Sequence, residues 1–454
     1  MLERFFQLKK HKTDVRTEII AGITTFMTMA YIIFLNPSIL SSTGMDPQAI
    51  LFATCVAAGV VTIAMGLYVN IPVALAPGMG LNAYFAVVAS KQGGMDWRIA
   101  LGAVFISGIV FVILTVTNVR QLLVVAIPGS LKKAITVGIG LFITIIGLKL
   151  SEILVVKAHP IPPTMEEFAK NGVAQLKFFE WDLFLGNLTQ GAPLVTLIGL
   201  IITAVLMANH VKGALLIGIL ASTIIGIPFQ VTPTEGFVFQ LPRFTNLAVG
   251  ALDIPGAFRM GLWTVVFTFT FVELFDTFGT LVATTTKIGV IDEKGKSPVI
   301  GKAMLIDALG VSFGALVGTS TVTAYVESAA GIGEGGRTGL TAVTTGVLFL
   351  LALLLAPFAA LIPNAATSPA LIIVGLLMVT TIREINFEDF TEGFPAFLTI
   401  TLMPFTYNIA NGIAAGLTFY TLLKLLTGKA KDIHWLMYIL AGLVIVRYAF
   451  LGGE

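Results

Sequence analysis

The amino-acid sequence predicts an all-α polytopic membrane protein of fourteen spans, arranged as two inverted sets of seven. Three observations support this fold: the composition, the recurrence of long apolar windows, and two interrupted spans at matching positions. Of the 454 residues, 56% are hydrophobic and 11% are charged, and mean hydropathy is +0.94. Soluble chains carry about a quarter charged residues, so this composition excludes a soluble globular protein. Cys55 is the single cysteine, which excludes an intrachain disulfide, and we expect no cofactor and no metal site.

Apolar windows long enough to cross roughly 30 Å of hydrocarbon recur along the whole chain. We place them at 18–38, 47–69, 73–90, 97–119, 130–150, 189–208, 211–227, 261–286, 299–317, 319–334, 338–360, 367–382, 392–409 and 411–427. The basic N-terminal segment 1–17 is too interrupted to be a cleavable signal peptide. Most Lys and Arg residues outside the spans fall on the side of this segment, which predicts a cytoplasmic N-terminus in a cell membrane protein. A further apolar stretch, 433–450, either makes an extra crossing or lies in the interface, and Arg447 favours the interface.

Two spans are interrupted, and they occupy equivalent places in the two halves. Seven spans precede an outer loop at 228–260 and seven follow it. Because each half has an odd number of spans, the two halves have opposite orientations in the membrane. Pro77 and two glycines break the third span, and the tenth is rich in Gly, Ser and Thr from Gly318 to Gly331. Paired broken spans indicate a binding site near the membrane midplane. The alternative is a pair of ordinary helix-packing surfaces built from small residues.

Four carboxylates lie in apolar sequence around these interruptions: Glu273, Asp276, Asp307 and Glu327. An ionised group in hydrocarbon is costly, so such residues face a bundle interior or a water-filled path and serve transport. Glu273 and Asp276 are one helical turn apart, and at low dielectric at least one of them should hold a proton near neutral pH. A proton-coupled carrier needs this property. The alternative role for Asp276 or Asp307 is structural, and sodium is the competing coupling ion.

Hydrogen-bonding and aromatic side chains near these acids suggest the chemistry of a ligand. A carboxylate accepts two hydrogen bonds at once, and Asn82 offers both a donor and an acceptor. Nearby aromatic rings that can stack on a flat ligand are Tyr84, Phe85, Phe271, Phe275, Phe278 and Tyr325. This set suits a planar, neutral heterocycle with N–H donors along one edge and acceptors along another.

Three sequence runs resemble a known transporter family. They are PGMGLNAYF (77–85), ELFDTFGTL (273–281) and GTSTVTAYVESAAG (318–331). They resemble the nucleobase:cation symporter family of the nucleobase–ascorbate transporter superfamily, in its azaguanine-resistance-like branch of adenine, guanine and hypoxanthine permeases. Supporting runs are AGITTFMTMAYIIFLNP (21–37), TTIREINFEDFTEGFPAFLTI (380–400) and MPFTYNIANGIAAG (403–416). The resemblance extends over nearly the whole chain.

The resemblance implies a division into a core domain and a gate domain. The core would comprise 18–119 and 261–360, and the gate 130–227 and 367–427, with short strands in spans three and ten. Carried over by motif position, the substrate-binding residues would be Asn82, Glu273, Phe275, Thr277, Tyr325, Glu327 and Ser328, while Asp276 and Asp307 would couple protons or shape the site. Thr277 and the Glu327–Ser328 pair differ from uracil- and xanthine-type relatives, which favours the adenine–guanine–hypoxanthine group.

The expected function is secondary active import of a purine nucleobase by proton symport with elevator-type alternating access. The alternatives are a carrier of the same fold for uracil, xanthine or an anion, or a sodium-coupled carrier. We find no repeated filter motif of a channel, and no nucleophile–His pair, metal cluster or phosphate loop of an enzyme. The expected partners are a purine base and membrane lipid, without nucleic acid, and a homodimer is expected by analogy.

Overall fold

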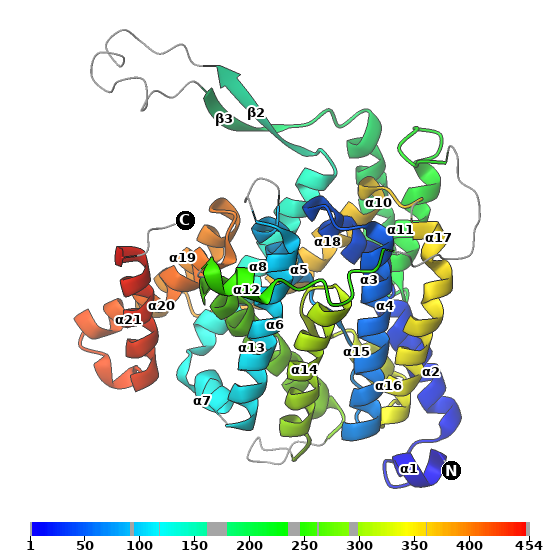
Figure 1. The fold of residues 1–454 in the computed structure, drawn as a ribbon, viewed down its shortest axis with the longest axis horizontal. Coiled ribbons are helices and arrows are strands. Elements are labelled where there is room, and N and C mark those ends of the chain that lie inside the picture. Colours follow the sequence, from blue (N-terminus) through cyan, green and yellow to red (C-terminus); the bar gives the residue numbers. More distant parts are fainter. Residues whose placement is uncertain are drawn as a thin grey trace.

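The fold is known from a computed structural model, which describes residues 2–90, 95–117, 119–160, 179–234, 246–260, 263–289, 298–359 and 361–450. In this part of the chain, ten helical segments are long and apolar enough to cross a membrane. The chain is therefore a mostly helical, multi-pass membrane protein. Figure 1 shows the N-terminus at one end of the helix bundle and the β2–β3 hairpin at the other. We call these the N-terminal end and the hairpin end.

The chain contains the following helices and strands, given in chain order. The first part contains α1 (Leu2–Phe6), α2 (Val15–Met29), α3 (Ile32–Leu40), α4 (Pro47–Ala64), β1 (Leu75–Pro77), α5 (Met79–Val88), α6 (Trp97–Val116), α7 (Val119–Ala126), α8 (Gly129–Leu150), β2 (Leu154–Pro160), β3 (Phe179–Leu185), α10 (Gly191–Ala208) and α11 (Ala214–Ile225). The second contains α12 (Ile254–Arg259), α13 (Trp263–Lys287), α14 (Pro298–Val317), β4 (Val322–Ala324), α15 (Ser328–Gly333), α16 (Gly339–Leu351), α17 (Ala356–Ala359), α18 (Asn364–Val379), α19 (Phe390–Phe405), α20 (Ile409–Leu426) and α21 (Trp435–Phe450).

The two short strands expected in the interrupted segments are present, and they pair with each other. β1 and β4 run antiparallel, with Ala76 opposite Thr323. Pro77 ends β1 because it has no N–H to donate, and α5 begins two residues later. Each strand thus leads into a short helix, and the pairing brings two segments about 250 residues apart into contact.

The first predicted span, 18–38, is divided into two helices. α2 ends before Ala30, and α3 begins after Tyr31. The Ile33 N–H donates to the Ala30 carbonyl and the Phe34 N–H to the Tyr31 carbonyl, which is the tighter spacing of a 3₁₀ turn. This local change of helical winding was not predicted from the sequence.

The helices pack in two groups. In one group, α6 packs on α14, and α16 packs on α4 and α2; in the other, α8 packs on α18 and α19, and α10 on α11 and α18. Small residues allow close approach within each group, as expected for membrane helices. A Cβ atom on Gly346 would lie 2.6 Å from the Gly59 carbonyl oxygen, and one on Gly375 would lie 2.5 Å from that of Gly140.

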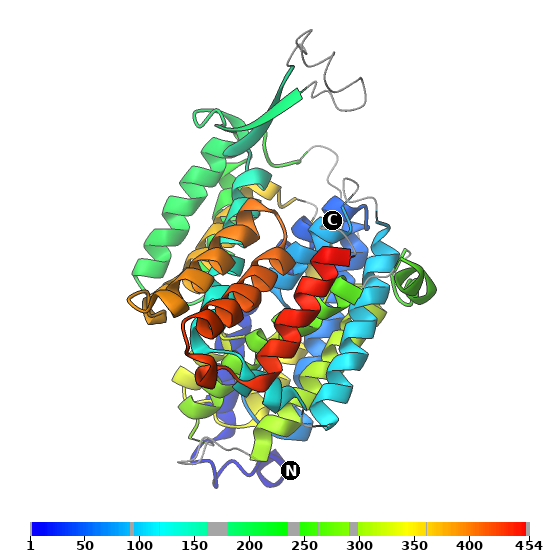
Figure 2. The ribbon, with the colours of Figure 1, turned by 90° about the vertical axis from the view of Figure 1, so that its left-hand side faces the viewer.

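The C-terminal helix α21 lies against α20, as Figure 2 shows in red and orange. At one end of the pair, the Tyr438 hydroxyl donates to the Ala430 carbonyl at 3.3 Å. At the other end, the Tyr448 hydroxyl donates to Asn411 in the first turn of α20. α21 therefore runs antiparallel to α20 along nearly its whole length.

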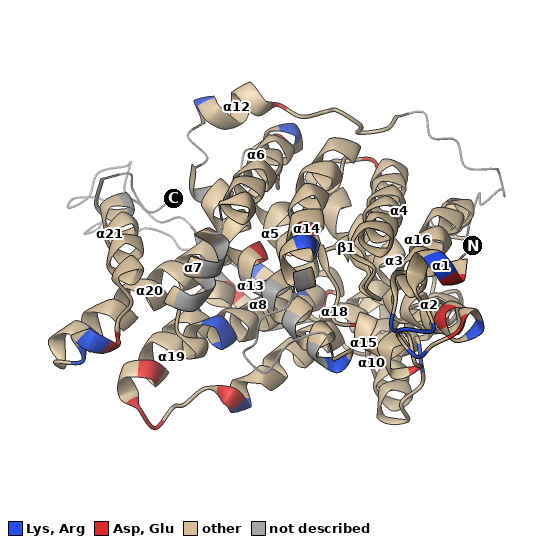
Figure 3. Cartoon of the chain, turned by 90° about the horizontal axis from the view of Figure 1, so that it is seen from below, with Lys and Arg blue, Asp and Glu red and all other residues tan. Residues whose placement is uncertain are grey.

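Charged residues concentrate at the ends of the bundle. Figure 3, seen from the N-terminal end, shows Lys, Arg, Asp and Glu mainly in α1, in connecting segments and near helix termini. The hairpin at the opposite end pairs Leu154 with Leu185 and Lys157 with Asp182. This hairpin was not predicted from the sequence.

Candidate functional site

A cavity of about 340 Å³ lies where the paired strands lead into α5 and α15; we call it the central cavity. One wall is formed by Tyr31, Gly78, Met79, Gly80, Gly279, Thr280, Ala283, Thr323, Ala324, Tyr325, Val326 and Glu327. The opposite wall is formed by Thr136 of α8, by Val374, Leu377 and Met378 of α18, and by Thr381 just after α18. The cavity therefore lies between the two packing groups of helices, with the broken segments on one side and α8 and α18 on the other.

Glu327 is the carboxylate of the central cavity. It occupies the position just before α15, and the Tyr31 hydroxyl donates to its Oε1 at 2.8 Å. Tyr31 is only 1% exposed. This hydrogen bond fixes one carboxylate oxygen, so the Glu327 side chain has a defined orientation at the cavity wall.

A second group of acidic and hydroxyl side chains lies directly behind the strand wall; we call it the acid cluster. It consists of Glu273 and Thr277 of α13, Asp307 of α14 and Thr323 of β4, all buried. The Thr277 Oγ1 lies 3.2 Å from Glu273 Oε1, 2.9 Å from Asp307 Oδ1 and 2.9 Å from Thr323 Oγ1. Thr323 also lines the central cavity, so one side chain joins the two sites.

The acid cluster cannot form all of these hydrogen bonds with both acids ionised. A threonine hydroxyl carries one hydrogen, so Thr277 can donate to only one of its three neighbours. Thr323 can supply a second hydrogen, but only toward Thr277. A proton on one of these carboxyl groups, or a cation among them, would make the contacts of Thr277 to Glu273 and to Asp307 favourable together.

Three of the predicted site residues hold the strand pair in place. Ser320 donates to Asn82 Oδ1, and the Asn82 amide donates to the Pro77 carbonyl at 3.4 Å. The Ser328 hydroxyl accepts the Ala74 N–H at 3.0 Å, and the Tyr325 hydroxyl donates to the Pro77 carbonyl. Among these, Tyr325 lines the central cavity, whereas Asn82 and Ser328 are not among its lining residues.

Some of the remaining predicted aromatic and acidic residues have described side chains, and others do not. The side chains of Phe275, Asp276 and Phe278 lie outside the described part of the structure. Phe271 stacks on Phe267 with ring centroids 5.1 Å apart, in an apolar cavity formed with α6 and α7. Tyr84 packs edge-on against Phe269. Tyr325 is therefore the predicted stacking residue that the structure places at the central cavity.

Two charged groups away from the central cavity were not anticipated from the sequence. Glu18 of α2 is fully buried and accepts the backbone N–H groups of Arg337, Thr338 and Thr341 at 2.8–3.1 Å. These N–H groups lie at the start of α16, where unpaired donors and the helix dipole favour an anion. Glu18 thus fastens α2 to α16.

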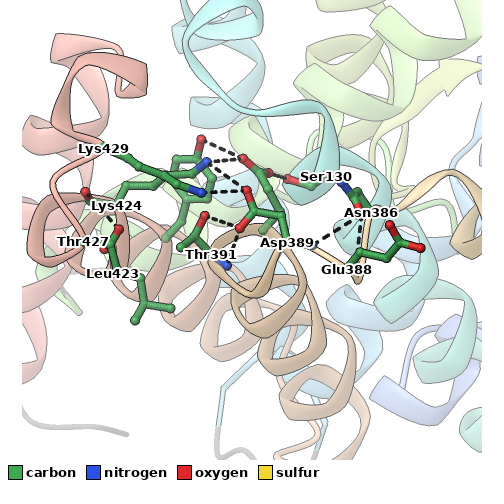
Figure 4. A network of polar contacts seen from close by, with 11 residues as sticks. Ser130, Asn386, Glu388, Asp389, Thr391, Leu423, Lys424, Thr427 and Lys429 are labelled. Carbon is green, nitrogen blue, oxygen red and sulfur yellow. Dashed lines mark hydrogen bonds and ion pairs between the residues drawn. The ribbon is translucent and has the colours of Figure 1, made fainter.

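The second group joins the starts of α8 and α19 to the end of α20 (Figure 4). Lys424 Nζ lies 2.8 Å from Glu392 Oε1, and Ser130 donates to the other Glu392 oxygen. Lys429 Nζ lies 3.1 Å from Asp389 Oδ2. Hydrogen bonds from Thr391 and the nearby Lys429 hold the pKa of Asp389 well below its usual range. The group fastens three helices together at the N-terminal end.

In the described part of the chain, no three His, Cys, Asp or Glu side chains gather in a way that could hold a metal ion. The polar atoms of the central cavity and the acid cluster, in the described part of the chain, are those of carboxylates, hydroxyls and backbone groups.

The fold resembles solved transporter structures at low sequence identity. The transmembrane domain of a cyanobacterial bicarbonate transporter, BicA, matches with a TM-score of 0.61 at 15% identity, covering 88% of this chain and 97% of that domain. SLC26A9 matches with a TM-score of 0.64 at 10% identity, covering 92% of this chain and 67% of the other. These similarities establish the fold alone.

Sequence comparison identifies closer relatives along the whole chain. Putative permease MJ0326 of Methanocaldococcus jannaschii is 45% identical and covers 100% of this chain and 99% of its own. The adenine permease AdeP of Escherichia coli K12 is 42% identical, with 99% and 96% covered. The guanine/hypoxanthine permease PbuG of Bacillus subtilis 168 is 39% identical, with 99% and 100% covered.

The family described as "Permease family" (Xan_ur_permease) matches residues 16–415. This match confirms the resemblance noted from the three sequence runs. The chain therefore belongs to this permease family of membrane transporters.

Proposed function

We propose that this protein is a secondary active importer of purine nucleobases, namely adenine, guanine, hypoxanthine or several of these, driven by proton symport. The observation that carries the proposal is the central cavity, in which Glu327 stands at the junction of two broken spans. The names of the relatives, adenine permease and guanine/hypoxanthine permease, support this choice of cargo. The cavity of about 340 Å³ has ample room for a planar bicyclic base.

The cavity wall suits a neutral base with N–H donors. Since Tyr31 occupies Oε1 of Glu327, the other carboxylate oxygen can accept a ring N–H of the base. The hydroxyl of Thr280 and those of Thr136 and Thr381 on the opposite wall can bond the remaining polar atoms. The Tyr325 ring supplies an aromatic surface.

An anion is the weaker candidate cargo. Glu327 would repel it, and no Lys or Arg is among the described residues that line the central cavity. A bicarbonate-type substrate, as named for one structural neighbour, would want a cation or free helix N-terminal amides in place of a carboxylate. The lining therefore favours a base over an anion.

We propose that the acid cluster carries the coupling proton. A proton on Glu273 or Asp307, or a cation among them, would make both contacts of Thr277 favourable, and Thr323 connects the cluster to the cavity wall. Arrival of a base beside Thr323 can change the hydrogen-bond direction through Thr277. Binding of base and proton would thus be linked, as symport demands. Sodium is the alternative occupant of the same cluster.

The packing pattern supports fourteen spans in two inverted sets of seven. The contact of α6 with α14 is mirrored by that of α16 with α4, and the contact of α10 with α11 by that of α19 with α20. Likewise, the contact of α10 with α18 is mirrored by that of α19 with α8. The contact of α11 with α18 is mirrored by that of α20 with α8. We propose that 18–119 and 261–360 form a core that moves as an elevator against a gate formed by 130–227 and 367–427, with the N-terminus in the cytoplasm.

Uptake of labelled bases tests the cargo. Cells that lack purine transport and express this chain should take up adenine, guanine or hypoxanthine with saturable kinetics, and unlabelled base should compete. Uracil and bicarbonate should compete poorly. Absence of saturable uptake for all three purines, with the protein present in the membrane, would contradict the proposal.

Proteoliposomes with imposed gradients test the coupling. An inward proton gradient should drive accumulation, and a sodium gradient alone should not. Asp307→Asn should abolish gradient-driven accumulation but preserve exchange of internal for external base, because it removes a carboxyl of the acid cluster and leaves Glu327 intact. Glu384→Gln, at an exposed ion pair, is the matched control and should behave as the unaltered chain. Undiminished accumulation by Asp307→Asn would remove the acid cluster from the coupling mechanism.

A further inference from the structure

A second cavity, of about 540 Å³, lies at the hairpin end of the bundle; we call it the hairpin-end cavity. One side includes Ser42, just after α3, and Ser90, just after α5. The other side includes Lys149 near the end of α8, together with Tyr407 and Asn408 in the turn between α19 and α20. Like the central cavity, it lies between the two packing groups of helices.

The two cavities are aligned along one face of α5. Gly80 lines the central cavity, and Ala83 and Val87 line the hairpin-end cavity, a spacing that places all three on one helix face. Between the cavities, α8 presents the buried side chains of Ile139 and Ile143. A Cβ atom on Gly80 would lie only 2.4 Å from Ile139 Cγ2. The two cavities therefore lie along one face of α5, and the contact of Gly80 with Ile139 separates them.

The hairpin-end cavity offers donors and positive charge, the opposite of the central cavity. Lys149 Nζ lies 4.4 Å from the ring centroid of Tyr407, and no carboxylate of the described chain forms an ion pair with it. Asn408 Oδ1 already accepts the Ala410 N–H at 2.9 Å, whereas its two amide N–H donors have no bond to another described residue and can serve a ligand. The Lys149 ammonium and the Asn408 amide therefore favour a ligand that presents acceptors toward them.

The backbone of this turn is held in a costly conformation. Tyr407 has φ +53°, which is unfavourable for a residue with a side chain and costs on the order of 1 kcal/mol or more. The conformation ends α19 in a Schellman motif, in which the Tyr407 N–H donates to the Pro404 carbonyl and the Asn408 N–H to the Met403 carbonyl. Here the conformation sets Tyr407 beneath the Lys149 ammonium and Asn408 at the start of α20.

We propose that the hairpin-end cavity is an access site that receives the purine base from outside the cell, before the core carries Glu327 to it. Lys149 and Asn408 would bind the acceptor edge of the base, its ring nitrogens and, in 6-oxopurines, its carbonyl oxygen. Glu327 would then take the donor edge in the central cavity. This inference rests on the proposed function, and it adds a second site that reads the opposite edge of the same ligand.

Cysteine labelling tests whether the base occupies this cavity. Cys55 is the chain's only cysteine and is buried, so a cysteine introduced at Ser42 or Ser90 can be labelled selectively. A membrane-impermeant maleimide should label both variants in intact cells, and hypoxanthine or guanine should slow the labelling. Thr189→Cys, exposed at the hairpin end and outside the cavity, should be labelled at the same rate with and without base. Labelling only after the cells are permeabilised, or labelling that base does not slow, would overturn the proposal.

Substitution of Lys149 separates this site from the central cavity. Lys149→Met should raise the KM of uptake about tenfold, the value of one charge-assisted hydrogen bond, while Lys149→Arg restores it. Lys149→Met should not change the Kd of base for the central cavity, measured on purified protein in the conformation that leaves this cavity accessible. Glu327→Gln, in contrast, should lose binding and uptake together. An unchanged KM in Lys149→Met, with normal uptake by the unaltered chain, would overturn the access site alone. Loss of saturable uptake by the unaltered chain would instead remove the proposed function and this inference together.

Discussion

The hydrogen bond from Tyr31 to Glu327 gives a quantitative prediction for base binding. The hydroxyl donates at 2.8 Å to a carboxylate oxygen at the cavity wall, and Tyr31 is 1% exposed, so water does not readily replace it. Tyr31→Phe removes this donor and leaves the ring in place. Hydrogen bonds to charged groups contribute about 1.5 kcal/mol or more, which corresponds to roughly tenfold in a dissociation constant. We therefore expect the Kd for purine base to rise about tenfold in Tyr31→Phe, because Glu327 loses its fixed orientation.

Equilibrium binding of labelled base to purified protein measures this effect, and a double-mutant cycle assigns it. In a Glu327→Gln background, Tyr31→Phe should add little further loss, because the two residues act through one contact. Tyr438→Phe removes a peripheral tyrosine hydroxyl and serves as the control, with unchanged Kd expected. Equal affinity for Tyr31→Phe and the unaltered chain would refute the idea that Tyr31 positions Glu327, and an additive cycle would show that Tyr31 acts elsewhere.

Three further changes test the rest of the structure. Gly80→Ala should strongly reduce uptake by clashing with Ile139, and Ile139→Ala should restore part of it; normal uptake by Gly80→Ala would show that these helices do not slide closely past each other. Glu18→Ala should lower stability by about 2 kcal/mol, because it leaves buried N–H groups at the start of α16 unpaired, and an unchanged unfolding temperature in detergent would contradict this. Lys424→Met should cost about 3 kcal/mol by stranding the Glu392 carboxylate, and Glu392→Gln in the same chain should recover part of the loss in the same assay.

The broken segments were predictable from sequence because their signals are local. Pro77 and Gly78 disfavour a continuous helix, and Glu327 stands out as an acid in apolar sequence. The pairing of the two segments was expected only through the family resemblance, because antiparallel contact between Ala76 and Thr323 depends on the folding of both halves. Local chemistry therefore located the two broken segments, and tertiary structure brought them together.

Tyr31 was missed because its role depends on a contact across 296 positions of the chain. In sequence it is one aromatic residue in an apolar run, and hydropathy does not distinguish it from packing residues. The change of helical winding at Ala30–Tyr31 would have been the signal, but no proline or glycine marks it. Asn82 shows the converse, because its polarity suggested direct ligand contact and the structure places it against Ser320 and Pro77.

Glu18 and Lys424 lie at the ends of the predicted spans 18–38 and 411–427. Near the end of a span, a charge in the sequence gives no indication of whether it meets water or the terminus of another helix. The structure shows that both are buried and paired with distant groups. Such contacts follow from how helices are arranged and not from the composition of any one helix.

Binding of labelled hypoxanthine, guanine and adenine to the purified protein, compared with Glu327→Gln, tests the central claim most directly. The unaltered chain should bind at least one of these bases saturably in the central cavity, and Glu327→Gln should lose that binding while unfolding at the same temperature. Base binding of undiminished affinity by a well-folded Glu327→Gln protein would contradict the account.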